Sequence, residues 1–422
     1  MKRLVQWSLF LFLIACACPV YALAEWTVIA YFVAEEGDKQ STLEDAQIRN
    51  INQMATPGSS DQVNLLVQMD RGQGLSALMK ETYADPNYSG AKRYRLAGGK
   101  WNALEKLGEV NMGSPYALWE CLKWAAEKYP AKRYALFINS HGSGVFSWRG
   151  TGATGSTSPG AVEFNPDRFV AYDTADNDCL TVFEVAAVLR AFRKKLNAGR
   201  PMSLIGFDAC YSGCIEALYQ FRDSTEVMMA SPSETAMTGF PYGSIARALH
   251  AVPALDPEKL AEMATEAYIK NTNSSNAQVM GAWRATKAGR LANAIGQLAF
   301  EIDQAMQQTG KKFGVQSIVA CGDKERYWDI RRVAQSIKTG NASFNGATNL
   351  TTIQQLAGDV ENAVNDARIS VWYDGRFAEG KVGGLSIAWP GAAEYQQWRA
   401  FYKALEFSAD THWDEMLDRR EL

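Results

Sequence analysis

The sequence predicts an α/β protein built on a mostly parallel sheet with helices on both of its faces. Two observations favour this class. Short apolar segments alternate with helical segments up to about residue 231, and the apolar segments are continuous hydrophobic runs. Strands that are covered on both faces have such runs, and the strand–helix alternation is typical of parallel crossover connections.

Length and composition agree with a large folded protein. The chain has 422 residues, of which 47% are hydrophobic and 21% charged, enough for one large domain or two smaller ones. Twelve Trp and seventeen Tyr weigh against disorder. The formal net charge of -3 gives no indication of a nucleic-acid partner or of attraction to an anionic membrane.

The N-terminus has the pattern of a secretory signal peptide, which we assign to residues 1–24. Two basic residues precede an apolar run over 4–17, and the small-residue site 22–24 follows it. The mature chain is therefore expected to be secreted or periplasmic. Residues 13–16 (Leu-Ile-Ala-Cys) also resemble a lipoprotein box, so lipid anchoring at Cys16 is the alternative.

The cysteines do not predict a disulfide scaffold. Loss of the signal peptide would leave an odd number of them, namely Cys121, Cys179, Cys210, Cys214 and Cys321. This density is too low for a disulfide-stabilised chain of this size. At least one free thiol is expected, and a free thiol in an exported protein is notable.

The first part of the catalytic region, which we assign to residues 25–250, begins with apolar strands and capped helices. The expected elements are a strand over 26–33, a helix opened by the capping box Ser41–Glu44, a strand over 63–69, a short strand over 92–96, a helix capped by Ser114 with Pro115 at its first position, and a strand over 134–139. A glycine-rich stretch over 147–160 follows. Its length is typical of a lid, a flexible segment or a processing site.

The second part of this region repeats the alternation. The expected elements are a strand over 169–173, a helix over 182–196 opened by the capping box Thr181–Glu184, a strand over 204–207 and a strand over 226–230. Residues 251–422 form a helical C-terminal region. Its expected elements are helices over 257–270, 284–308 and 327–337, and late strands over 369–373 and 385–389 that return to a sheet.

Cys210 follows the strand over 204–207 and precedes a helical run, which is where an α/β sheet exposes a nucleophile. Of the three histidines, only His141 lies at a strand end in a glycine-rich turn. If the strands over 134–139 and 204–207 are parallel neighbours, His141 and Cys210 meet at one edge of the sheet. A nearby imidazole supplies the base that a thiol needs. The alternative for any single cysteine is a buried, inert thiol.

Short motifs spread along the chain carry a family resemblance. They lie at residues 26–31, 108–113, 139–144, 205–210, 215–216, 240–242, 327–329 and 384–390. The His-Gly pair at 141–142 and the Asp-Ala-Cys motif at 208–210 are specific together. This set resembles the clostripain-like cysteine peptidases, a branch of the caspase-like clan with gingipains and legumain. The resemblance implies a caspase-like sheet with a helical C-terminal extension.

The resemblance also implies an activity. It implies an endopeptidase with a His141–Cys210 dyad that cleaves protein or peptide substrates after Arg or Lys and requires no cofactor. Calcium dependence and self-cleavage occur in the family. Arg149, in the glycine-rich stretch, is the candidate self-cleavage residue.

The chemistry of the motif residues agrees with these implied roles. The N–H groups of Cys210 and Gly142 would form an oxyanion hole. Asp208 would share a strand face with Cys210 and pair with the basic P1 side chain in the S1 pocket. The pocket wall would come from the segment 230–234 (Ala-Ser-Pro-Ser-Glu), which holds Ser231, Pro232 and Ser233.

Two features leave alternatives open. Asp173, Asp176 and Asp178 have the spacing of calcium ligands, but they lack the glycine and late Glu of an EF-hand, so a solvated turn is the other interpretation. The segment 211–214 departs from the family pattern, as does Ser140, which puts substrate preference in doubt. An acyl transferase with the same Cys–His pair and a catalytically silent exported binding protein are the alternative functions.

Overall fold

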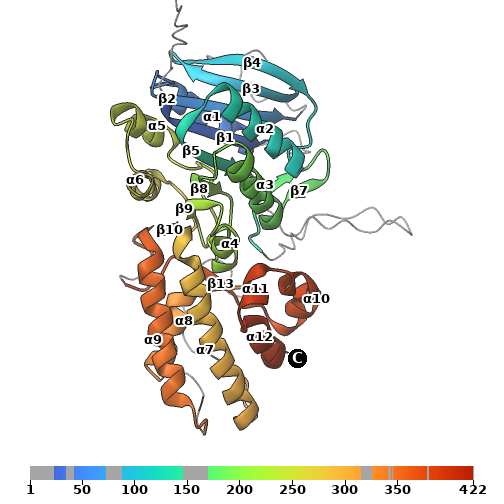
Figure 1. The fold of residues 1–422 in the computed structure, drawn as a ribbon, viewed down its shortest axis with the longest axis vertical. Coiled ribbons are helices and arrows are strands. Elements are labelled where there is room, and N and C mark those ends of the chain that lie inside the picture. Colours follow the sequence, from blue (N-terminus) through green and yellow to red (C-terminus); the bar gives the residue numbers. More distant parts are fainter. Residues whose placement is uncertain are drawn as a thin grey trace, which may run out of the picture.

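A nine-stranded sheet runs through the part of the chain that the structure describes (Figure 1). The computed structural model describes residues 23–34, 42–72, 88–145, 170–314, 326–340, 344, 346–377 and 380–421. The strands, in spatial order, are β12 (Arg368–Tyr373), β10 (Val279–Arg284), β9 (Thr225–Ala230), β8 (Met202–Asp208), β5 (Ala131–Asn139), β1 (Ala24–Val33), β2 (Val63–Arg71), β3 (Gly90–Ala97) and β4 (Lys100–Gly108).

The five central strands of this sheet, from β9 to β2, run parallel to one another. Two antiparallel strands extend the sheet on each side. The predicted class, a mostly parallel central sheet between helices, is thereby confirmed. The parallel part brings the C-terminal ends of β5 and β8 to the same edge of the sheet.

Helices cover both faces of the sheet, and each face has its own hydrophobic core. One face carries α1 (Thr42–Ala55), α5 (Tyr242–Ala251) and α6 (Pro257–Asn271), and the other carries α2 (Pro115–Lys128), α3 (Val182–Lys195), α4 (Ile215–Gln220) and α7 (Ala288–Thr309). Alternate residues of β1 belong to opposite cores: Val28 faces one and Ile29 the other. Burial on both faces explains why the central strands are continuous apolar runs.

Two of the predicted helix starts are confirmed by their hydrogen bonds. The Ser114 side chain accepts a bond from the N–H of Tyr116, with Pro115 at the first position of α2. Thr181 and Glu184 form the reciprocal capping box of α3. Such caps satisfy amide groups that have no partner within the helix.

The capping box predicted at the start of α1 is not seen in the described residues. Ser41, the other half of its expected capping box with Glu44, lies outside the described residues. The Glu44 carboxylate is buried and accepts hydrogen bonds from Arg71, at 2.5 Å and 3.1 Å. This residue therefore stabilises a contact between α1 and β2.

Most of the C-terminal region, from α7 onward, lies in the lower half of the molecule in Figure 1, and the region also completes the sheet, because β10 and β12 come from it. Its remaining elements are α8 (Ile330–Lys338), α9 (Leu350–Ala367), α10 (Ala392–Lys403), α11 (Glu406–Asp410), α12 (Trp413–Glu421), and a small sheet of β11 (Tyr327–Asp329) with β13 (Ser386–Ala388). No helix in the described ranges has both the length and the apolar character that crossing a membrane requires.

Several predictions for this region were wrong in detail. The helix expected over 327–337 starts only at Ile330, because 327–329 pair with β13 as a strand. The late strand expected over 385–389 joins that small sheet and not the main one. Strand β10 and helix α9 were not predicted. Their burial depends on partners far away in the sequence, which local patterns do not reveal.

Candidate active site

The predicted neighbours at the sheet edge are confirmed as adjacent strands. Strands β5 and β8 pair in parallel, with Asn139 opposite Asp208. His141 and Cys210 each lie two residues beyond these partners. A Cβ atom placed on Gly142 would lie 2.7 Å from the carbonyl oxygen of Cys210 and 2.9 Å from its nitrogen. The turn that carries His141 therefore contacts the backbone of Cys210, and only a glycine allows this approach.

The Cys210 thiol is half-buried and has a hydrogen-bonding neighbour that the sequence did not reveal. The N–H of Thr235 donates to its sulfur at 3.3 Å, and the Thr235 hydroxyl lies 3.6 Å from the same atom. Burial raises the pKa of the thiol, while the bonds from Thr235 lower it. The resting thiol is therefore protonated at neutral pH, and a nucleophilic thiolate requires a proton acceptor.

His141 is the imidazole at this sheet edge, and its side chain is exposed. The other two histidines lie elsewhere. His250 is exposed at the end of α5, and His412 lies beside α12, 3.7 Å from Asp303 and 3.8 Å from Glu415. Among the histidines of the described residues, His141 is therefore the one whose turn contacts the Cys210 backbone, as the sequence predicted.

The backbone after Cys210 is held in an unusual conformation. Tyr211 has a φ of 58°, in the left-handed region that side chains rarely adopt. Its N–H donates to the Ser233 carbonyl at 2.9 Å, and that of Gly213 donates to the Ser231 carbonyl at 2.7 Å. The described residues provide no hydrogen-bond acceptor for the N–H of Gly142 or Cys210.

These two backbone bonds hold the segment predicted as the S1 wall directly beside the loop that follows Cys210. Its side chains point inward, however. Ser231, Pro232 and Ser233 are all buried, and the Ser231 hydroxyl accepts the N–H of Ser233 at 3.1 Å. Half-buried Glu234 and Thr235, which follow, are the side chains of this segment nearest to solvent at the thiol. Glu234 belongs to the predicted wall segment, whereas Thr235 was not predicted from the sequence.

Asp208 is buried in a polar network at the base of the site. One carboxylate oxygen, Oδ2, accepts bonds from the Asn139 side chain at 2.5 Å, the Phe240 N–H at 2.9 Å and the Tyr242 hydroxyl at 3.0 Å. Within the described ranges no hydrogen bond reaches Oδ1. Burial raises the pKa of Asp208 to about 6, although these bonds oppose the rise. The carboxylate is therefore charged at neutral pH.

The candidate calcium residues lie in a hairpin of β6 (Ala171–Asp173) and β7 (Asp178–Leu180). Asp173 is buried and accepts bonds from three backbone N–H groups, including that of Asp176, and Asp178 accepts one from Asn111. In the described part of the chain, no three His, Cys, Asp or Glu side chains gather as metal ligands. Calcium dependence stays a prediction. Arg149 and Cys16 lie outside the described residues.

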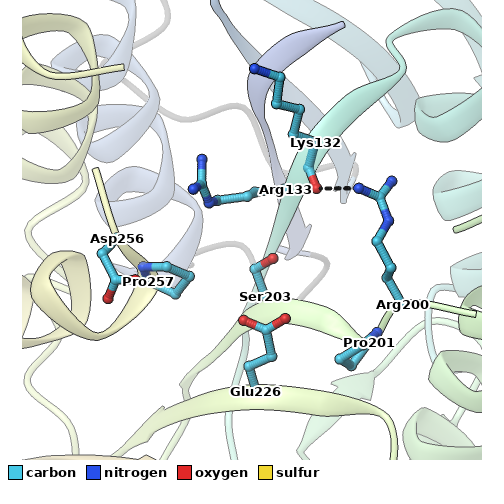
Figure 2. A pocket seen from close by; sticks show the side chains of 8 residues that line it. All are labelled: Lys132, Arg133, Arg200, Pro201, Ser203, Glu226, Asp256 and Pro257. Atoms are coloured by element: carbon cyan, nitrogen blue, oxygen red, sulfur yellow. Dashed lines mark hydrogen bonds between the residues drawn. The ribbon is translucent and has the colours of Figure 1, made fainter. Parts of the chain in front are cut away.

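A cavity of about 350 Å³ lies at the opposite end of the same strands (Figure 2). Its lining carries both charge signs and consists of Lys132, Arg133, Arg200, Pro201, Ser203, Glu226, Asp256 and Pro257. Asp256 is already the N-cap of α6 and accepts the N–H of Glu258. Lys132 and Arg133 begin β5, whereas His141 follows its end, so this cavity is separate from the thiol site.

A thiol and an imidazole that follow neighbouring parallel strands, in a sheet covered by helices on both faces, have the arrangement of a cysteine hydrolase on an α/β fold. The comparison with known families specifies the class further. The chain belongs to the clostripain family (Peptidase_C11), whose model matches residues 32–419. This match confirms the family that the sequence motifs predicted.

Individual relatives agree with this assignment. Clostripain from Hathewaya histolytica is 24% identical over 233 residues, which cover 49% of this chain and 40% of that protein. The match therefore spans less than half the length of this curated relative. A secreted C11 cysteine protease from Bacteroides thetaiotaomicron, solved with an irreversible peptide inhibitor, has a TM-score of 0.63 and 18% identity over 93% of this chain and 100% of its own. An inactive zymogen C11 protease from Parabacteroides distasonis has the same TM-score and identity, over 93% and 99%.

Proposed function

We propose that the chain is an exported cysteine endopeptidase that cleaves after Arg or Lys, with Cys210 as nucleophile and His141 as acid–base residue. One observation carries this proposal: the turn of His141 rests on the backbone of Cys210 at the ends of adjacent parallel strands. Membership in the clostripain family supports it. So do the solved relatives that are described as cysteine proteases.

The proposed reaction uses only groups of this chain and a water molecule. The Cys210 sulfur attacks the scissile carbonyl carbon, while its proton passes to His141. The N–H groups of Gly142 and Cys210 stabilise the oxyanion. His141 then protonates the leaving amine as the C–N bond breaks. Water, deprotonated by His141, hydrolyses the thioester and restores the thiol.

Specificity for a basic P1 residue is assigned to Asp208. Its Oδ2 is saturated by three donors, which leaves Oδ1 for a guanidinium or ammonium group. The buried position makes this charge pair strong because water competes little with it. With a pKa of about 6, the carboxylate is ionised at pH 7 and becomes neutral as the pH falls below 6. Recognition of a basic P1 residue is thus lost on the acid side.

Hydrolysis of matched peptides with Arg, Lys, Asp or a neutral residue at P1 tests this assignment. We expect Asp208→Asn to lower kcat/KM for the Arg peptide by about 10² to 10³-fold, since it removes a buried charge partner. The neutral peptide should lose far less. For the wild type, the advantage of Arg over the neutral residue should shrink as the pH falls through about 6.

Asp414 offers a matched control for that variant. It is also buried, and burial raises its pKa to about 6, but it lies in α12. Asp414→Asn should leave the ratio of Arg to neutral hydrolysis unchanged. Cleavage after Asp and not after Arg or Lys would refute the role of Asp208. Absence of thiol-dependent cleavage of any peptide would refute the peptidase, leaving an acyl transferase or a silent binding protein.

Export is proposed on the basis of the signal pattern in residues 1–24. The solved relative from Bacteroides thetaiotaomicron, which is described as secreted, supports it. Lipid anchoring at Cys16, self-cleavage at Arg149 and calcium dependence stay predictions from the sequence.

A further inference from the structure

Tyr327, the first residue of β11, reaches from the C-terminal region into the loop that follows His141. The ring is buried, and its hydroxyl makes two backbone contacts. It accepts the N–H of Val145 at 2.7 Å and donates to the Ser143 carbonyl at 3.0 Å. These groups lie two and four residues after His141, so one phenol holds both sides of this loop.

The same ring also contacts the nucleophile loop. Tyr327 stacks on Tyr211, the residue after Cys210, with ring centroids 6.0 Å apart and planes 8° from parallel. Gly144 packs against both residues with a φ of 70°, and a Cβ there would lie 2.5 Å from the Tyr211 carbonyl oxygen and within contact of the Tyr327 hydroxyl. The two loops and the phenol therefore fit together without spare space.

The strand that carries Tyr327 is itself tied to the nucleophile loop. Strand β11 pairs with β13, whose Ser386 donates its N–H to the Gly213 carbonyl at 3.0 Å. Ser386 also forms a parallel bridge with Cys214. Tyr327 is thus anchored to the segment after Cys210 through β13, while its hydroxyl binds the loop after His141. The distance between the two loops depends on this connection.

We propose that Tyr327 is a positioning residue that fixes the loop of His141 relative to Cys210. The C-terminal region is then a component of the active site. The inference rests on the proposed dyad. Proton transfer requires the imidazole within hydrogen-bond reach of its partner, and a displacement of about 1 Å can cost about 10²-fold in rate. Loss of the Tyr327 hydroxyl leaves the Val145 N–H and the Ser143 carbonyl to find other partners, which shifts the loop.

Tyr327→Phe tests the inference, because it keeps the ring and its stack on Tyr211 and removes only the hydroxyl. We expect kcat for the Arg peptide to fall about 10 to 100-fold, with KM changed by less than about 2-fold. We also expect the pH dependence of Cys210 alkylation by iodoacetamide to shift, since this profile reports the coupling of thiol and imidazole without any substrate.

Tyr395→Phe is the matched control. Tyr395 is buried in α10, and its hydroxyl donates to the Asp414 carbonyl at 3.0 Å and to Asp418 at 2.8 Å. Its loss should lower the thermal midpoint but leave kcat and the alkylation profile unchanged.

Three kinetic outcomes in a folded variant would overturn the inference. They are unchanged kcat and alkylation in Tyr327→Phe, equal losses in both tyrosine variants, or a change in KM alone. A wild type that cleaves no peptide but whose alkylation profile shifts in Tyr327→Phe would refute the proposed peptidase and retain the positioning role. A Tyr327→Phe chain that is unfolded by circular dichroism would also count against the inference, because the role would then be structural.

Discussion

Cys210→Ala is expected to lower kcat/KM for a peptide with Arg at P1 by about 10⁴-fold or more, to the level of the assay background. The variant is expected to retain the fold, because alanine fits the half-buried position. What it loses is the proposed nucleophilic sulfur that follows β8. Steady-state hydrolysis of the Arg peptide by purified variant and wild type measures the effect.

Cys214→Ala is the control for this prediction. Cys214 is four residues further on, buried, and the N-cap of α4. Burial raises the pKa of its thiol well above the usual value, which is typical of an inert cysteine. The variant should keep activity within a few fold. If activity survived in Cys210→Ala and disappeared in Cys214→Ala, Cys214 would be the nucleophile and the assignment of Cys210 would be wrong.

His141→Ala should lower kcat for the same peptide by about 10³-fold, within the range of general acid–base catalysis. Burial raises the pKa of the Cys210 thiol and so favours its protonated form. The variant lacks the imidazole that would accept this proton. The remaining rate should rise with pH, because hydroxide progressively replaces the missing base. A pH–rate profile of the variant between pH 6 and pH 9 checks this slope.

His250→Ala serves as the comparison for that variant, because His250 is exposed at the end of α5. It should have the wild-type profile. If His141→Ala retained the wild-type rate and pH profile, the base would have to be another group, and the dyad would be wrong.

The parts of the site that the sequence predicted are those set by local patterns. The continuous apolar run of 204–207 indicates a buried strand, and the residues after it lie at the sheet edge by necessity. The glycine-rich turn of His141 was predictable for the same reason, because it directly follows the apolar run of 134–139. The caps at Ser114 and Thr181 were predictable because a helix start depends on a few adjacent residues.

The parts that the sequence did not predict depend on contacts across long separations. The bond from Val145 to Tyr327 spans 182 residues, and that from Thr235 to Cys210 spans 25. The hydrogen bonds from Phe240 and Tyr242 to the Asp208 carboxylate also join residues that are distant in the sequence. Residue type alone does not distinguish a carboxylate at the base of a pocket from one that caps a helix. Only the fold brings these partners together.

Labelling with an irreversible, thiol-directed peptide that carries Arg at P1 tests the central claim most directly. The folded wild-type chain is incubated with a peptidyl chloromethyl ketone and digested, and the modified residue is located by mass spectrometry. We predict one adduct per chain, on Cys210, at a rate that His141→Ala lowers and excess Arg substrate suppresses. An adduct on another cysteine, or labelling of Cys210 that is unaffected by His141→Ala, would contradict the dyad.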